Sequence, residues 1–539
     1  MAAGCGQVRK KDMEGKFTLH VSNSSLIICL PQRIQPRTMS SFTYQPQLRP
    51  ALALVQGPKE YREERDLFIR IDDILTRSGL EHRFIELSLK HRQINIEHHS
   101  AKSIDHISQA AVLSLRGNIA RHITQLSHRN FCVRVADSAL LQWFLQIGRV
   151  DGVKAFAKSS SDRFAHSVDA STLHSLNTEL VTLLANAGEE INTTSLNLAE
   201  PISFEDVYFD STCLKAPIHF PVDWVLLRDA VRTLMKATLL IRKTGLLHRM
   251  PQEPLSFLSD INTLCMKMTA KNRTKDGKKH RKAVLREMKK LSKRVGKHAS
   301  NHLKILENRK NEIDLTDGEI SQISKRINNI LQQLPAAIKQ AHERIIGGRR
   351  LANKDKILSL YDPDVQVLKR GKSNAEVEFG NKLWLGETRE GLIVDYMLEK
   401  EKTSDTRHVP AAINRLIEEQ KLPIKSIWGD RGLHSACNEK LLEQKNIRSG
   451  LCPRDVRDLS DRLANEAGMR EGLKRRAGTE ARISILIRNF MGTPTRAKGF
   501  EHRDMMLGWA VFSHNLWVLA RLKQSSHPKE IEPPEQIAA

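Results

Sequence analysis

The strongest constraint on the fold is a pair of short apolar segments, each of which ends on an aspartate. We expect one strand over residues 204–210, closed by Asp210, and a second over 424–430, closed by Asp430. A third acidic residue, Glu480, lies in an arginine-rich run with helical character. Two aspartates at strand ends and a glutamate on a helix can converge on a pair of divalent cations, an arrangement that cleaves and joins phosphodiesters.

The charge of the chain points to a polyanionic partner. The 539 residues include 86 Lys and Arg against 62 Asp and Glu, which gives a formal net charge of +24 at pH 7. Such an excess favours a polyanion, most commonly nucleic acid. An anionic membrane surface is the alternative, but we find no run of about 18 apolar residues that would span a bilayer and no signal peptide. The sequence therefore predicts a DNA-handling protein that does not enter a membrane.

The cysteines argue against a disulfide framework and against a zinc knuckle. The chain has 7 cysteines, an odd number, and no two of them form a Cys-x-x-Cys pair. This usage is typical of a reducing compartment.

The length allows two to four domains. Residues 1–45 mix Gly, Ser, Pro and basic residues without periodicity, and we interpret them as a poorly ordered extension. Apolar residues at helical spacing then predict a helical domain over 46–200, which is either a DNA-binding domain or a plain helical bundle. The last segment, 522–539, contains three prolines and is interpreted as a tail.

Residues 201–521 show the mixed order of strands and helices that predicts an α/β domain. A helix is expected over about 224–243, with Asp223 as its N-cap. The other expected elements are a hairpin of 382–385 and 391–397, a helix near 408–420, a helix at 435–445, a strand near 447–452, and helices that carry Glu480 and residues 509–522.

A dense run of lysine and arginine over 270–310 lies inside a helical insertion at about 225–355. A helix with this much charge of one sign can bind DNA phosphates. The alternative is a solvated helical hairpin, because charge runs usually face water. The residues expected to contact DNA in this run are Lys278, Lys279, Arg281 and Lys282.

Four sequence blocks, taken in order, span roughly residues 205–521. The blocks are 209–212 with 219–223, then 359–364 with 370–372 and 377–380, then 429–435, and finally Arg476, Glu480 and Arg488 with 491–499. Together they resemble bacterial insertion-sequence DDE transposases, which have an RNase H-like catalytic core. The N-terminal part is similar more loosely, through residues 140–145.

The resemblance implies an RNase H-like mixed-sheet core with a helical N-terminal domain and a basic helical insertion. It implies that Asp210, Asp430 and Glu480 hold two Mg²⁺ ions, with Mn²⁺ as an alternative. The implied activity is cleavage at the ends of a mobile element and joining of the free 3′-OH groups to target DNA. The implied partners are element-end DNA, target DNA and a second copy in a homodimer on DNA, in the bacterial cytoplasm at the nucleoid. Residues that would contact phosphate are Arg476, Arg488, Arg496 and Lys498.

The chain departs from the family pattern at two positions. Leu433 stands where such proteins often have an aromatic residue, and Ile487 stands where related enzymes can have lysine. Arg488 is adjacent to Ile487 and can substitute for that lysine.

Each candidate also has a plainer interpretation. The two aspartates can be turn residues at strand ends, and Glu480 can be a surface carboxylate paired with Arg476 at i,i+4. Lower-ranked acidic candidates are Asp206, Asp223 and Asp395. His219 and His434 are interpreted as structural histidines, and the alternative is that they contact DNA or support the site. Two other functions stay open: a non-catalytic DNA-binding protein, such as a decayed transposase or a regulator, and a nuclease that never joins strands.

Overall fold

The computed structural model describes residues 49, 51–52, 57–148, 152–186, 198–270, 276–372, 375–401, 403–492, 495 and 497–523. All of these belong to one compact unit within Thr43–Ala539. The predicted N-terminal extension and most of the predicted tail lie outside the described residues. Every helix in the described ranges is too short or too polar to span a lipid bilayer.

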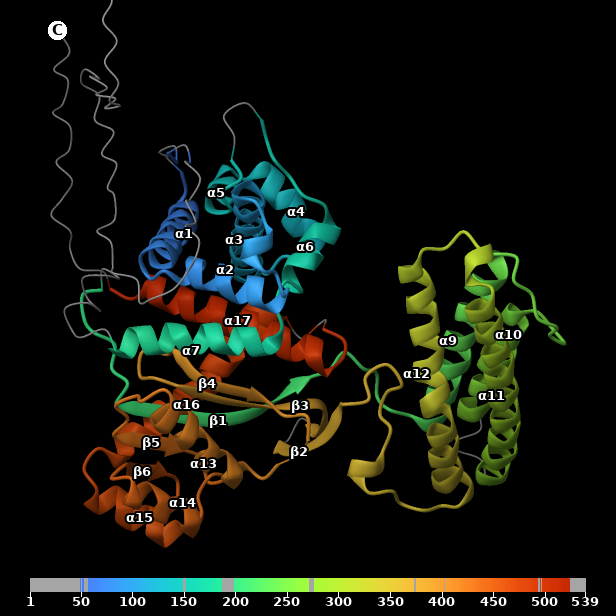
Figure 1. The fold of residues 1–539 in the computed structure, drawn as a ribbon. Helices are drawn as coiled ribbons and strands as arrows, with labels where there is room; N and C mark the ends of the chain where they lie inside the picture. Colours follow the sequence, from blue (N-terminus) through green and yellow to red (C-terminus); the bar gives the residue numbers. More distant parts are fainter. Residues whose placement is uncertain are drawn as a thin grey trace, which may run out of the picture. The chain divides into compact units, whose positions relative to one another are not determined.

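A six-stranded mixed sheet carries the central residues of the chain (Figure 1). Its strands are β1 (Asp206–Lys215), β2 (Gln366–Lys372), β3 (Ala375–Glu387), β4 (Ile393–Leu398), β5 (Ser426–Gly429) and β6 (Arg448–Leu451). The order is β2-β3-β1-β5-β6, and β4 also pairs with β3. Strand β1 is parallel to β5, and β5 is parallel to β6, whereas the pairings of β3 are antiparallel. The predicted mixed α/β class is confirmed, and so is the predicted hairpin of β3 and β4.

Both faces of the sheet are covered, as expected for strands with apolar residues on both sides. On one face, Phe209 stacks on Trp384 at 4.8 Å between ring centroids, and Trp384 stacks on His408 at 4.9 Å. On the other face, Leu214 and Leu385 share an apolar cluster with residues of α16 (Met469–Ile485), η7 (Leu486–Met491) and α17 (Phe500–Arg521).

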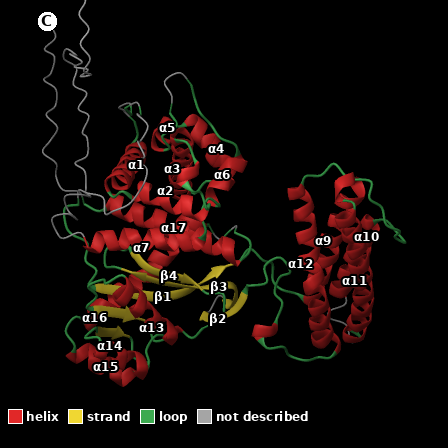
Figure 2. Cartoon of the chain, viewed as in Figure 1, coloured by secondary structure: helices red, strands yellow, loops and turns green. Residues whose placement is uncertain are grey.

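Short helices lie beside β5 and β6, which are labelled in Figure 1, and Figure 2 shows these helices in red. They are η5 (Asp405–Arg407), α13 (His408–Ile413), η6 (Asn414–Glu419), α14 (Ala436–Gln444) and α15 (Val456–Asn465). The helices predicted near 408–420 and at 435–445 are confirmed. Helix α15 and strand β2 were not predicted, because both are short and most of their residues are polar.

The N-terminal region is helical, as predicted. Its elements are α1 (Lys59–Arg77), α2 (Leu80–His91), η1 (Ile96–His98), α3 (Ala101–Ile123), α4 (His128–Asp137), α5 (Ala139–Phe144), α6 (Lys158–Ala165) and α7 (Ala170–Asn186). The C-terminal helix α17 packs among them: the Trp509 ring lies 5.8 Å from Phe84, and its Nε1 donates to the Ala165 carbonyl at 3.1 Å. Of the 22 residues of α17, 16 are buried, and they include four polar or charged ones, Arg503, Ser513, His514 and Asn515. Helix α17 therefore joins the N-terminal helices to the sheet (Figure 1).

Four long helices form the predicted insertion. They are α9 (Asp223–Lys243), α10 (Pro254–Ala270), α11 (Gly277–Asn308) and α12 (Asp317–Ala341). The short helix η2 (Lys310–Glu312) lies between α11 and α12, and η3 (His342–Ile346) and η4 (Asn353–Asp355) follow α12. Leu234, Phe257, Met288 and Ile327 contribute to a shared apolar core, one from each long helix.

The prediction that Asp223 is the N-cap of its helix is wrong. Val222 is the N-cap, and Asp223 is the first helical residue. The Asp223 carboxylate accepts hydrogen bonds from Gln340 Nε2 at 2.9 Å and from Arg344 Nη1 at 2.8 Å. These partners come from α12 and η3, which the local sequence around Asp223 does not reveal.

Candidate active site

Asp210 lies in the middle of a strand, so the prediction that it closes a strand is wrong. Strand β1 continues to Lys215 because its second half pairs antiparallel with β3. That half is polar and small, with Ser211, Thr212 and Cys213, and so it lacks the apolar run that marks a strand. Asp430, in contrast, follows β5 directly, as predicted.

The register of the parallel strands β1 and β5 places Asp210, on β1, beside Asp430, directly after β5. Asp206 pairs with Ser426 and Tyr208 with Trp428. The same offset continues to Asp210 and Asp430, beyond the last paired residues. Since alternate residues of a strand face the same side, both aspartates point to the face of Tyr208 and Trp428, which helix α16 covers.

Helix α16 lies very close to that face at Gly472. A Cβ atom at this position would meet the Trp428 ring at 2.0 Å, so only glycine allows the observed approach. Glu480 follows eight residues later, about 12 Å along the helix axis. The close contact at Gly472 therefore sets how far along the sheet Glu480 can reach.

A buried carboxylate on β3 fixes the same helix. Glu387 is fully buried, with Arg475 Nη1 at 3.0 Å from its Oε1 and Arg482 Nε at 3.1 Å from its Oε2. Both arginines belong to α16 and flank Glu480 in sequence. Arg482 passes over Gly391, where an added Cβ would lie 2.1 Å from the guanidinium and where φ is +94°. Glu387 is thus a buried polar link between α16 and the sheet, and no local sequence pattern marks it.

The three predicted carboxylates line one open pocket of about 500 Å³. Asp210 comes from β1, Asp430 follows β5, and Glu480 projects from α16. The side chains of Arg488 and Lys369 also line this pocket. All three residues that we predicted to be catalytic therefore line one pocket, with one of the predicted phosphate contacts, Arg488.

A fourth carboxylate, Asp405, lines the same pocket and was missed by the sequence analysis. Its Oδ1 accepts a hydrogen bond from Ser211 Oγ at 3.5 Å, and it forms an ion pair with Lys382. Asp405 begins a 3₁₀ turn in a loop, and no strand or helix pattern marks it.

The pKa of Asp210 is raised to about 6, chiefly by burial of the carboxyl and in smaller part by the negative charges of Asp430 and Glu480. The Arg476 guanidinium and the Ser211 backbone N–H, which donates to Asp210 Oδ1 at 2.7 Å, act in the opposite direction. A buried carboxyl next to like charges is disfavoured as an anion, and a bound cation would reverse that balance.

The carboxylates suit a hard divalent cation by their chemistry, because Mg²⁺ prefers oxygen ligands. They do not form a coordination sphere: among the described residues, no three His, Cys, Asp or Glu side chains are grouped closely enough to hold an ion. The Glu480 side chain is 68% exposed, and its Oε1 lies 3.7 Å from Arg476 Nη2. The plainer interpretation of Glu480 as a surface carboxylate is thus the observed arrangement, and metal binding requires this ion pair to open.

The other predicted DNA contacts are scattered over the molecule. Lys498 is exposed but is not part of the pocket lining, and Arg496 lies outside the described residues. Lys278 and Lys279 are exposed, and Lys282 is half-buried. The Arg281 guanidinium lies 4.9 Å from the centre of the Trp224 ring, so part of its role is structural.

The lower-ranked candidates have structural partners instead. Trp428 Nε1 donates to Asp206 at 3.3 Å, and Arg415 Nη2 donates to Asp395 at 2.8 Å. His219 Nε2 lies 2.9 Å from Asp229 Oδ2, and His434 Nε2 lies 3.5 Å from Glu439 Oε1.

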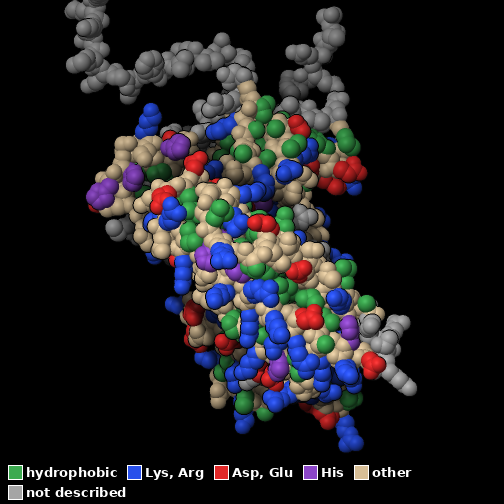
Figure 3. All heavy atoms as spheres, turned by 90° about the vertical axis from the view of Figure 1, so that its right-hand side faces the viewer, with side chains coloured by type: hydrophobic (Ala, Val, Ile, Leu, Met, Phe, Trp, Pro, Cys, Tyr) green, Lys and Arg blue, Asp and Glu red, His purple; other side chains and the backbone are tan. Residues whose placement is uncertain are grey.

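Helix α11 presents a stripe of basic side chains opposite its buried stripe. Lysine and arginine side chains gather over the helical bundle in the view of Figure 3. The exposed members on α11 are Lys278, Lys279, Arg286, Lys290, Lys293, Arg294, Lys297 and Lys304. Within the described part of the chain, none of these eight forms an ion pair with an acidic residue. A surface of uncompensated positive charge suits phosphate binding.

Comparison with known proteins gave no match to a family model, a curated protein or a solved structure. The functional conclusion therefore depends on the residues of the site.

Asp210→Asn is expected to stabilise the metal-free protein at neutral and alkaline pH. Between about pH 4 and pH 6 the unfolded chain releases the Asp210 proton while the folded chain keeps it, so this group lowers stability as pH rises. A pKa shift of this size corresponds to a gain in unfolding free energy of at most roughly 3 kcal/mol for the variant above pH 6. Urea unfolding in EDTA should show that the gain in the variant is small near pH 4 and largest near pH 8. An equal difference between variant and wild type at both pH values would contradict the assigned pKa.

Proposed function

We propose that this chain is a metal-dependent DNA strand-cleaving and strand-transfer enzyme of the DDE transposase type. The observation that carries the proposal is the shared pocket of Asp210, Asp430 and Glu480. These residues come from two neighbouring parallel strands and from a helix whose register is fixed by Gly472 and Glu387. The large positive charge supplies the affinity for the polyanionic substrate.

Each pocket residue has a definite task in this proposal. Divalent cations held by the three carboxylates would activate the attacking oxygen and stabilise the leaving oxygen. Arg488 and Lys369 at the pocket would neutralise the phosphates on either side of the scissile bond. Arg476, which is released from Glu480 when that carboxylate turns to a cation, would become free to contact phosphate. At about pH 6 and below, Asp210 would give up its proton on cation binding.

Further features belong to the same proposal. The mixed sheet with a central β1, parallel to β5 and antiparallel to β3, is compatible with an RNase H-like core. A homodimer on DNA, with element-end and target DNA as substrates and a location at the bacterial nucleoid, would follow from such an activity.

A non-catalytic DNA-binding protein is the second candidate. The ion pair of Glu480 with Arg476, and the absence of a grouped ligand set in the described residues, favour it. A cleavage assay on DNA that flanks the coding sequence separates the two. The enzyme is expected to release 3′-OH ends only when Mg²⁺ or Mn²⁺ is present, whereas the binding protein would retain the DNA without cutting it. Strand-transfer products in the same reaction distinguish a transposase from a nuclease.

DNA binding is expected to weaken steeply with salt, because lysine and arginine contacts release counterions from the phosphates. For six or more contacts, affinity for duplex DNA should fall by about a thousandfold or more between roughly 50 and 200 mM salt. Fluorescence anisotropy in EDTA measures binding without cleavage. Affinity that stays constant across the titration would rule out the basic surfaces as DNA contacts.

A further inference from the structure

We propose that the bundle carries a second nucleic-acid site, between α9 and α12, that binds unpaired single-stranded DNA. The site is an open pocket of about 330 Å³ beside the exposed ring of Tyr361. Its lining includes three basic side chains: Arg232 and Lys236 from α9, and Arg326 from α12. The assignment of DNA as the nucleic acid rests on the proposed function, whereas the site itself is inferred from its own geometry.

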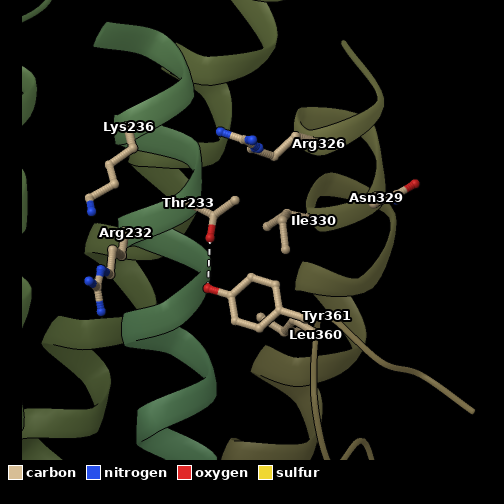
Figure 4. Close-up of a pocket in the computed structure, with 8 residues that line it drawn as sticks. All are labelled: Arg232, Thr233, Lys236, Arg326, Asn329, Ile330, Leu360 and Tyr361. Carbon is tan, nitrogen blue, oxygen red and sulfur yellow. Dashed lines mark hydrogen bonds between the residues drawn. The ribbon is translucent and has the colours of Figure 1, made fainter. Parts of the chain in front are cut away.

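The three cations surround the pocket without acidic partners. Figure 4 shows Arg232 and Lys236 on one helix and Arg326 on the helix opposite. All three side chains are exposed, and among the described residues none forms an ion pair. Three positive charges around one pocket repel one another, so they favour an anion between or alongside them.

The acidic residues closest in sequence to these three cations on α9 and α12 already have other hydrogen-bond partners. Asp229, one turn from Arg232 and Thr233 on α9, is buried and accepts hydrogen bonds from Arg228 and His219. Glu319, two turns before Arg326 on α12, closes the capping box of that helix with Thr316. Neither carboxylate is available to neutralise the pocket.

Tyr361 offers an aromatic face and no free hydroxyl. Its O–H donates to the Asp229 carbonyl at 3.2 Å, and its oxygen lies 2.8 Å from Thr233 Oγ1, which fixes the ring (Figure 4). The side chain is nevertheless among the exposed large hydrophobic groups, at 52%. A fixed and exposed ring next to lysine and arginine is the combination that binds single strands, with a base on the ring and phosphates on the cations. In a duplex the bases are stacked on one another, and this ring face would stay unused.

The test is DNA binding in EDTA by the full-length protein, so that cleavage plays no part. The charge variant is Arg232→Gln with Lys236→Gln and Arg326→Gln. Its control removes the same charge from exposed lysines outside the pocket, at Lys267, Lys421 and Lys440. The ring variants are Tyr361→Leu and Tyr361→Phe, of which only the second keeps the aromatic face.

Anisotropy with a single-stranded oligonucleotide is expected to give a clear pattern. The charge variant should bind at least about tenfold more weakly, and its salt slope should fall by about 2, since each lost phosphate contact removes roughly 0.7. Tyr361→Leu should weaken binding by about tenfold, and Tyr361→Phe, which keeps the ring but loses the hydrogen bonds that fix it, should bind clearly more tightly than Tyr361→Leu. The control triple variant and duplex DNA should show much smaller changes.

Three results would overturn the inference: equal losses in the charge variant and its control, equal affinities of the two Tyr361 variants, or a loss on duplex DNA as large as that on the single strand. A preference for single-stranded RNA over DNA of the same sequence would overturn the choice of DNA. Because binding is measured without metal, a wild type that never cleaves DNA would refute the proposed function and leave this site standing. If the wild type cleaves DNA and every pocket variant binds DNA like the wild type, the second site is refuted and the proposed function stands.

Discussion

Asp430→Asn is expected to abolish DNA cleavage while leaving DNA affinity almost unchanged. The amide keeps the size of the side chain and the hydrogen bond that Gly432 N donates to Oδ1 at 2.9 Å. It removes the negative charge that would hold a divalent cation in the pocket. Loss of several kcal/mol of charge stabilisation at the reacting phosphate corresponds to roughly a thousandfold or more in rate.

Binding and catalysis separate in this variant because the basic surfaces lie elsewhere. The exposed stripe of α11 does not line the carboxylate pocket. A gel shift beside a Mg²⁺ cleavage assay measures both properties. Asp458→Asn makes the same chemical change at an exposed position of α15 and should retain full cleavage. Wild-type cleavage by Asp430→Asn would refute the assigned role, and loss of cleavage in Asp458→Asn would show that the assay reports something else.

Glu387→Ala is expected to cost about 3 kcal/mol of unfolding free energy, because it leaves Arg475 and Arg482 without their buried partner. Cleavage should fall as well, by roughly tenfold to a hundredfold, since small displacements of a catalytic group are costly and α16 carries Glu480. Glu387 does not line the pocket, so its effect on catalysis acts through position.

Urea unfolding and single-turnover cleavage, measured on the same preparations, test this role. Glu443→Ala, at an exposed position on α14, is the matched control and should change stability by less than about 0.5 kcal/mol. Glu387→Gln keeps the volume and loses the charge, so its unfolding free energy should fall between those of wild type and Glu387→Ala. If Glu387→Ala were as stable and as active as the control, Glu387 would have no part in holding α16.

The features that the sequence predicted correctly are those with local signals. Strand β5 is a short apolar run with Asp430 directly after it, and the hairpin of β3 and β4 consists of two apolar runs joined by a turn that contains glycine. The basic helix α11 shows its buried stripe at helical spacing through Val284, Leu285 and Met288. Each of these signals arises from residues that are close together in the sequence, and periodicity reports only on such residues.

The features that escaped prediction depend on partners far away in sequence. The mostly polar residues 211–215 predict an end of β1 at Asp210, yet pairing with β3 extends the strand to Lys215. Glu387 meets arginines about 90 residues later, and Asp405 enters the pocket from a loop. Tertiary contacts of this kind override local propensity, and a single sequence does not display them.

The central claim is that Asp210, Asp430 and Glu480 bind divalent cations, and Mn²⁺ binding tests it most directly. Electron paramagnetic resonance follows free Mn²⁺ as it is added to the protein with DNA at about pH 8, where Asp210, with a pKa of about 6, is ionised. The wild type is expected to take up a pair of ions per chain. The double variant Asp210→Asn with Asp430→Asn is expected to take up none at the same concentrations, although it still binds DNA. Uptake by the double variant equal to that of the wild type would contradict the account.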